Sequence, residues 1–253
     1  MGMGDARLST IELDRPEVWP SDLIAVLTDH HDAFRSRERG PLSGGYDAAV
    51  YAVADALRPY AIVGWHCTRL ADHEIDDIKA RGMVLLDVDL VVRRVDAAIR
   101  HGLISAEQGA RLKATNQAVE RYRAGMLWFC FFRPAIAGEG GIGDLLRYWG
   151  GEAVYNSHDR HPEMGKAIAA IGRPAIVEAE IPIAWCGGDR GLRLAMNVGQ
   201  RFIIAQGTPS SNSTEVEDNI KQPLPAELIR KVHVFPDSEF LRLSGCAEWN
   251  RPL

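Results

Sequence analysis

The stretch Ala61–Arg69 most constrains what this chain can fold into, because an apolar run ends there in side chains that all make polar contacts. Its first five residues have the continuous apolar character of a buried strand. His66–Arg69 then place an imidazole, a thiol, a hydroxyl and a guanidinium together at the end of that strand. Two interpretations follow: a strand that holds a ligand, or a core strand with one hydrogen-bonded His and an exposed Arg.

Composition narrows the class of protein. The chain has 253 residues, 46% of them hydrophobic and 25% charged, which is enough for one large or two modest domains. Its formal charge of −5 provides no overall positive field for a nucleic-acid backbone, so any such contact has to be local. The four cysteines are widely spaced, and neither a signal-peptide pattern nor an apolar run of about 20 residues is visible. We expect a cytoplasmic protein with reduced thiols and no membrane span; a protein delivered into a target cell would look the same.

Hydrophobic periodicity predicts helices interrupted by strands, which is typical of an α+β fold. Helices are expected over residues 21–39, 47–57, 71–81, 144–149 and 162–171, with two more over 87–123 that divide at Gly102. Ser105 and Gln108 predict a capping box at the start of the second of these two. Strands are expected over residues 61–69, 83–86, 126–132, 175–185, 201–205 and 229–235, and a glycine-rich loop over 135–143. This pattern predicts a helical N-terminal cap over residues 1–59 and one domain over 60–253, with residues 87–123 as a helical insertion.

The predicted insertion is basic within an acidic chain. Between Arg93 and Arg123 there are seven Lys and Arg residues against three Asp and Glu residues. This is either a solvated helical face or a docking surface for an acidic partner. The residues proposed for docking are Arg93, Arg94, Arg100, Arg111 and Lys113.

Two histidine-containing stretches suggest metal ligands but do not reach a full set. A helix turns the three neighbours Asp29–His31 to different faces. His158 and His161 stand three apart without a further Cys or carboxylate pattern. We therefore assign no metal site, and keep a metal-dependent hydrolase using His66, His158 and His161 only as an alternative.

Gly64–Arg69 resembles the Trp-His-Gly-Ser/Thr-Arg strand of the ADP-ribosyltransferase superfamily, in its poly(ADP-ribose) polymerase-like branch. The order of later elements is similar too. Gly125–Phe129 is similar to the family's aromatic strand, and Asp144–Trp149 to the helix that presents a ring to nicotinamide. A polar loop leading to Glu215–Glu217 is similar to the loop before the catalytic Glu, and to the Glu-x-Glu of the toxin-like branch. The resemblance covers about residues 60–235 and implies a split mixed β-sheet core that uses NAD as substrate.

The resemblance also assigns roles to single residues. Contacts to NAD fall on His66, Cys67, Thr68, Arg69, Trp128 and Tyr148. His66 would donate to a ribose hydroxyl, Thr68 would bind the nicotinamide amide, and Arg69 would either pair with the pyrophosphate or make a surface salt bridge. Tyr148 is preferred over Trp149 for the ring stacked on nicotinamide. Cys67 stands where the family commonly has Gly.

The chemistry requires an anion near the sugar, because positive charge builds on the ribose when the bond to nicotinamide breaks. We prefer Glu217 for this catalytic role over Glu152, and expect Glu215 to orient the acceptor. The expected function is NAD-dependent ADP-ribosyl transfer, with release of nicotinamide, to a protein or nucleic-acid acceptor. An NAD glycohydrolase and a catalytically inactive binding module of the same fold remain alternatives.

Overall fold

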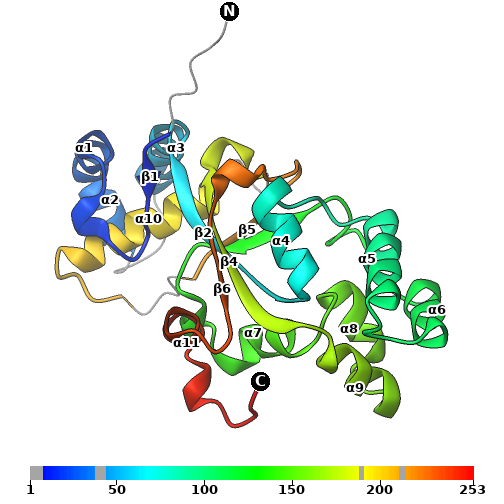
Figure 1. Cartoon of the computed structure of the whole chain (residues 1–253). Coiled ribbons are helices and arrows are strands. Elements are labelled where there is room, and N and C mark those ends of the chain that lie inside the picture. Colours follow the sequence, from blue (N-terminus) through cyan, green and yellow to red (C-terminus); the bar gives the residue numbers. More distant parts are fainter. Residues whose placement is uncertain (1–7, 38–43, 188–190, 211–214) are drawn as a thin grey trace, which may run out of the picture. The chain divides into compact units, whose positions relative to one another are not determined.

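The computed structural model describes residues 8–37, 44–187, 191–210 and 215–253. Its six strands form one sheet in the order β5-β3-β2-β4-β6, with β1 paired to β2 (Figure 1). The strands are β1 (Thr10–Ile11), β2 (Ala61–Leu70), β3 (Leu127–Cys130), β4 (Arg173–Pro182), β5 (Glu217–Ile220) and β6 (Ile229–Val234). β1 runs parallel to β2, and β4 runs antiparallel to β6. The mixture of helices with this sheet agrees with the predicted α+β class, and the family-specific split core stays a prediction.

The chain forms two compact units. Unit 1 comprises Met1–Gly64, Cys130–Phe132 and Glu180–Asn219, and unit 2 comprises Trp65–Phe129, Arg133–Ala179 and Ile220–Leu253. Unit 1 therefore contains more than the N-terminal segment predicted as a cap, because a helix from late in the sequence packs against the early ones. The division runs through β2, so that Trp65 and the residues after it belong to unit 2.

Helix packing organises unit 1. Its helices are α1 (Ser21–Asp29), α2 (His31–Arg37), α3 (Gly44–Leu57) and α10 (Leu192–Ala205), with 3-10 turns at Pro16–Val18 and Ile183–Trp185. α10 packs against α2 and α3, and Gly199 makes this close packing possible. A Cβ at Gly199 would lie 2.2 Å from the Phe34 ring, so the absent side chain leaves room for that ring.

Seven helices belong to unit 2 within the described residues. They are α4 (Asp72–Arg81), α5 (Val88–Arg100), α6 (Ala106–Ala114), α7 (Gly138–Arg147), α8 (Glu152–His158), α9 (Pro162–Ala170) and α11 (Ser238–Ser244). Further 3-10 turns lie at Pro134–Ile136, Ala226–Leu228 and Cys246–Glu248. The predicted capping box of α6 is confirmed: the Ser105 hydroxyl accepts from the Gln108 N–H, and the Gln108 side chain accepts from the Ser105 N–H.

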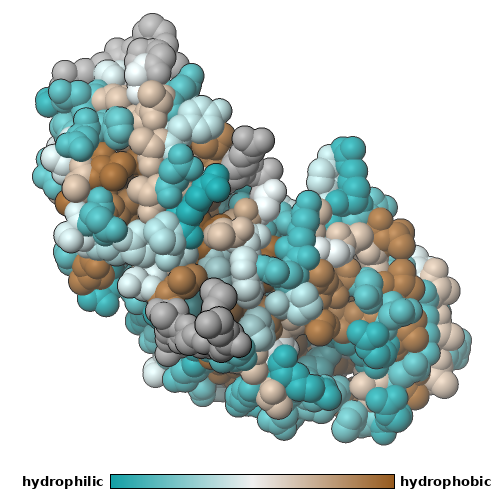
Figure 2. All heavy atoms as spheres, turned by 90° about the horizontal axis from the view of Figure 1, so that it is seen from above, coloured by the Kyte–Doolittle hydropathy of each residue, from teal (hydrophilic) through white to brown (hydrophobic). Residues whose placement is uncertain are grey.

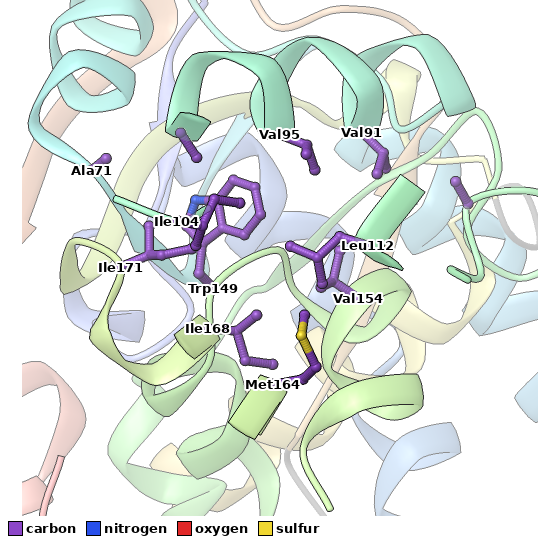
Figure 3. Close-up of a cluster of buried hydrophobic side chains, with 12 residues drawn as sticks. Ala71, Val91, Val95, Ile104, Leu112, Trp149, Val154, Met164, Ile168 and Ile171 are labelled. Atoms are coloured by element: carbon purple, nitrogen blue, oxygen red, sulfur yellow. The ribbon is translucent and has the colours of Figure 1, made fainter. Parts of the chain in front are cut away.

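Aliphatic side chains from α5, α6, α8 and α9 surround Trp149 to form a core cluster of unit 2. Figure 3 shows Trp149 in the middle of this cluster, between Val95 of α5 and Ile168 of α9. Val91, Val95 and Ala98 recur at helical spacing and give α5 one buried stripe. The exposed fraction of Trp149 is only 1%. Ala71, which joins β2 to the helix α4 that follows it, belongs to this cluster, so the junction of strand and helix packs against the helical layer.

Several sequence-based element assignments are wrong. Residues 201–205 were expected as a strand but end helix α10, whose buried Leu194, Val198 and Phe202 follow the helical period. Residues 135–143 were expected as a loop because they are rich in glycine, but they form a 3-10 turn followed by most of α7. The expected strand 83–86 is reduced to one bridge between Met83 and Leu224.

Other differences concern helix ends. The single helix expected over residues 21–39 is broken at His30, which takes a non-helical conformation between α1 and α2. Residues 116–125 lie in turns rather than continuing α6, and helix α8 was not anticipated.

The surface is a mixture of polar and apolar side chains. On the face seen in Figure 2, hydrophobic residues lie in small groups among hydrophilic ones. Within the described part of the chain, none of the helices combines the length and apolar character that spanning a bilayer requires.

Candidate functional site

His66 on β2 is held against the neighbouring strand β3. Its Nδ1 lies 2.8 Å from the carbonyl oxygen of Trp128, and its ring centroid lies 5.9 Å from that of Phe129. Burial lowers the pKa of His66 from its usual 6.5, and the positive charge of Arg94 lowers it further, against the opposing effect of the Trp128 carbonyl. The imidazole is therefore neutral at pH 7.

The hydrogen bond of His66 also fixes its tautomer. A carbonyl can only accept, so Nδ1 carries the proton and Nε2 carries the lone pair. This arrangement does not favour the expectation that His66 donates to a ribose hydroxyl. Nε2 can instead accept a hydrogen bond from a sugar hydroxyl.

Strand alternation separates the polar residues of β2 into two sets. Side chains of successive strand residues point to opposite faces, so His66 shares a face with Thr68, while Cys67 shares one with Arg69. Thr68 and Cys67 are each 6% exposed. The Cys that replaces the family's Gly thus lies on the face opposite His66, and this arrangement does not favour the predicted contact of Cys67 with NAD.

Arg69 ties β2 to two distant backbone segments. Its Nε donates to Ile171 O at 2.8 Å, Nη2 to Gly172 O at 3.1 Å and Nη1 to Leu146 O at 3.3 Å. Among the described residues Arg69 forms no salt bridge of the expected kind, and its guanidinium is half-buried among carbonyls. This geometry favours a structural role for Arg69 over its predicted contact with a pyrophosphate.

The three aromatic candidates have different environments. Trp128 on β3 is 36% exposed, and its indole N–H donates to the carbonyl oxygen of Tyr122 at 3.1 Å. Tyr148 lies at the C-cap of α7 rather than within a helix; it is half-buried, with its ring centroid 6.0 Å from that of Tyr155. Trp149 belongs to the core cluster, so the alternative of stacking Trp149 on nicotinamide is wrong. Trp128 presents the most accessible ring of the three.

The candidate carboxylates fall in different units. Glu217 is the exposed first residue of β5, as predicted for a late strand, and its backbone carbonyl accepts from Arg193. Glu215 is also exposed, and both belong to unit 1. Glu152 begins α8 in unit 2 and pairs with Arg123 at 2.9 Å. Residues 211–214 of the predicted polar loop lie outside the described residues. The choice between Glu217 and Glu152 stays a prediction.

A buried carboxylate that the sequence pattern did not indicate lies on α4, the helix that follows β2. Glu74 on α4, 8% exposed, accepts from Ala71 N at 2.8 Å, Arg94 Nε at 2.6 Å and Trp149 Nε1 at 2.9 Å. Burial raises the pKa of Glu74, but the charge of Arg94 and these hydrogen bonds outweigh that effect and hold the pKa below its usual 4.5. Glu74 is therefore ionised and anchors the start of α4.

Arg94 is misplaced in the predicted docking surface. It points inward to Glu74, with its guanidinium carbon 4.7 Å from the ring centroid of Trp149. Its position three residues after Val91, beside the apolar stripe of α5, is the sequence signal that could have shown this. Lys113 pairs with Asp96 at 2.5 Å. Arg93, Arg100 and Arg111 are exposed, as a docking surface requires.

The histidines of the hydrolase alternative have other partners. His158 Nε2 bonds to Thr115 O at 2.7 Å, and His161 Nδ1 accepts from the backbone N–H groups of Glu163 and Met164 at the start of α9. Among the residues that the structure describes, no group of three or more His, Cys, Asp or Glu side chains could hold a metal ion. Within that part of the chain the hydrolase alternative has no ligand set.

Comparison of the chain with protein-family models, with curated proteins and with solved structures found no match.

Proposed function

We propose that the protein cleaves NAD at the nicotinamide–ribose bond and transfers the ADP-ribosyl group to a macromolecular acceptor. The observation that carries this proposal is the neutral, oriented imidazole of His66, whose Nδ1 donates to the backbone carbonyl of Trp128, a residue of β3 with an accessible ring. Nε2 of His66 would accept from a ribose hydroxyl, and the Trp128 indole offers an aromatic surface to the nicotinamide ring. The Thr68 hydroxyl, on the same strand face as His66, would bind the nicotinamide amide.

The reaction follows from the bond that breaks. The electron pair of the C1′–N bond leaves with nicotinamide, so C1′ of the ribose becomes electron-deficient. A carboxylate stabilises that positive charge, and an acceptor nucleophile attacks C1′ and then loses its proton. We assign the carboxylate to Glu217 with Glu215 beside the acceptor, and keep Glu152 as the competing residue.

The test is the release of nicotinamide from NAD, followed by chromatography. We expect release by the wild type and a loss of about 100-fold in His66→Ala, which removes the group that orients the ribose. Arg160→Gln, a surface change in the same unit, serves as the matched control and should leave the rate unchanged. Absence of both nicotinamide release and an NAD-induced thermal shift in the wild type would overturn the proposal.

Two further experiments identify the catalytic carboxylate and the fate of the ADP-ribosyl group. Loss of activity in Glu217→Gln with retention in Glu152→Gln would support our choice of carboxylate, and the reverse pattern would contradict it. NAD labelled in its adenylate half separates the outcomes: label on a macromolecule means transfer, and free labelled ADP-ribose means glycohydrolase activity. Binding of NAD without release of nicotinamide identifies an inactive module.

A further inference from the structure

We propose that Arg94 of α5 supplies the guanidinium that binds the anionic part of the substrate at this site. The inference rests on the proposed function for the identity of that anion, the pyrophosphate of a dinucleotide. Its physical basis is independent of catalysis and lies wholly within unit 2.

The guanidinium of Arg94 is only partly used by the protein. Within the described residues, its hydrogen bonding is limited to the 2.6 Å contact between Nε and Glu74, and Nη2 is buried without a partner. A buried donor without an acceptor is unfavourable, and native proteins usually supply one from the chain, a water or a ligand. The edge formed by Nη1 and Nη2 is the edge that binds phosphate oxygens in pairs.

Arg69, the residue to which the resemblance assigns the pyrophosphate, is in the opposite condition. Each of its three guanidinium nitrogens already donates to a backbone carbonyl. Binding an anion there would remove or weaken contacts that hold β2 in place. Of these two half-buried arginines, Arg94 is the one whose guanidinium has N–H groups without an acceptor among the described residues.

Arg94 is also held in position before any ligand arrives. The Glu74 carboxylate fixes Nε, and the guanidinium plane lies over the indole of Trp149, which is itself immobilised in the core cluster. Such a pre-positioned fork loses little conformational entropy on binding. The positive charge of Arg94 lowers the pKa of His66, which indicates that the two side chains lie within electrostatic range of each other.

A second unsatisfied nitrogen lies on the same pair of helices. His73, which precedes Glu74 on α4, has a buried Nε2 without a hydrogen-bond partner among the described residues. Its ring stacks on that of His101, at the C-cap of α5, with centroids 4.3 Å apart. Among the described residues, two buried nitrogens on α4 and α5 thus have no hydrogen-bond partner: Nε2 of His73 and Nη2 of the positively charged Arg94.

The direct test uses inorganic pyrophosphate as the probe and the full chain as the protein. Calorimetric titration should show binding by the wild type, and Arg94→Gln should weaken it by at least about tenfold, the usual contribution of charge-assisted hydrogen bonds. Arg160→Gln removes the same charge from an exposed position of unit 2 outside the predicted docking surface and should retain wild-type affinity. Failure of the wild type to bind, or equal losses in the two variants, would overturn the inference.

Arg94→Gln also leaves Glu74 without its cation and can unfold the protein, so two further measurements are included. In the wild type, the NMR signal of the Arg94 side chain should shift on addition of pyrophosphate while that of Arg69 stays fixed; the reverse would contradict the inference. The paired variant Glu74→Gln/Arg94→Met removes both charges together and should fold without binding pyrophosphate. Neither readout requires NAD cleavage, so failure of the proposed function and failure of this inference are distinguishable.

Discussion

Among single residues, Glu74 should have a large effect on stability, because its carboxylate accepts from the backbone, from Arg94 and from Trp149. Glu74→Gln removes the anion from a half-buried cation and should lower the free energy of unfolding by about 3 kcal/mol. Asp76→Asn, an exposed change on the same helix, should alter it by less than about 0.5 kcal/mol. Urea denaturation of both variants measures the difference. Equal midpoints for the two would show that the Glu74 network contributes nothing.

The pH dependence of stability should reflect a second carboxylate, the half-buried Glu178. Its hydrogen bond with His233 at 2.8 Å lowers the pKa; burial opposes this, and the charges of His233 and Arg230 reinforce the lowering, so that the pKa lies below its usual 4.5. The unfolded chain then binds more protons than the folded one, so this contribution is present above about pH 4.5 and is lost as pH falls through the folded-state pKa.

The measurement that follows compares wild type with Glu178→Gln. The free energy of unfolding should fall more steeply in the wild type between about pH 5 and about pH 3. Parallel curves for the two proteins would contradict the role given to Glu178.

At the scale of elements, the turn after α4 depends on a glycine for two separate reasons. Gly82 has a φ of +82°, and a Cβ there would lie 2.0 Å from the carbonyl oxygen of Leu224. Gly102, after α5, has a φ of +69° but no atom within 4 Å of such a Cβ. Gly102→Ala should therefore cost about 1 kcal/mol, and Gly82→Ala about 2 kcal/mol more. Thermal unfolding of the two variants compares them, and an equal loss would mean that the Leu224 contact is easily relieved.

Elements were predictable from sequence where one local signal dominated. The apolar run of β2 and the capping box of α6 were read correctly, since each depends on neighbouring residues. Residues 201–205 were misread because Ile203–Ile204 favour a strand locally, whereas the buried stripe of α10 begins at Leu194. Helix α7 was not predicted because its glycines have a low helix propensity; packing of its buried face stabilises the helix instead.

The contacts within the candidate site could not be predicted from local sequence either. Polar residues at the end of β2 could be identified, but their partners lie far along the chain: Trp128 for His66, and Leu146 and Ile171 for Arg69. No local pattern encodes such contacts. Their geometry decides which arginine is engaged and which nitrogen of His66 carries the proton.

At the scale of the whole molecule, the reactivity of the four cysteine thiols tests the packing of both units. Burial, with a smaller effect from the charge of Asp218, raises the pKa of Cys186 to about 12, and Cys67 is also buried. Cys130 and Cys246 are partly exposed. In the folded protein at pH 8, an alkylating reagent should therefore modify Cys130 and Cys246 first, and all four should react after denaturation. Peptide mapping by mass spectrometry measures the order, and early labelling of Cys186 would contradict the packing of unit 1.

Arg69 also bears on how sequences of this kind should be interpreted. Because its guanidinium fastens β2 to the backbone near residues 146 and 171, selection for a stable fold is enough to retain it. A chain that had lost all chemistry would keep this arginine as firmly as an active one. Under the proposed function, the His-x-Thr-Arg signature is then informative about architecture at its final position, and about activity at His66 and Thr68. Under the proposed function, a search that weights the four positions equally would not distinguish an active chain from one that had lost the chemistry.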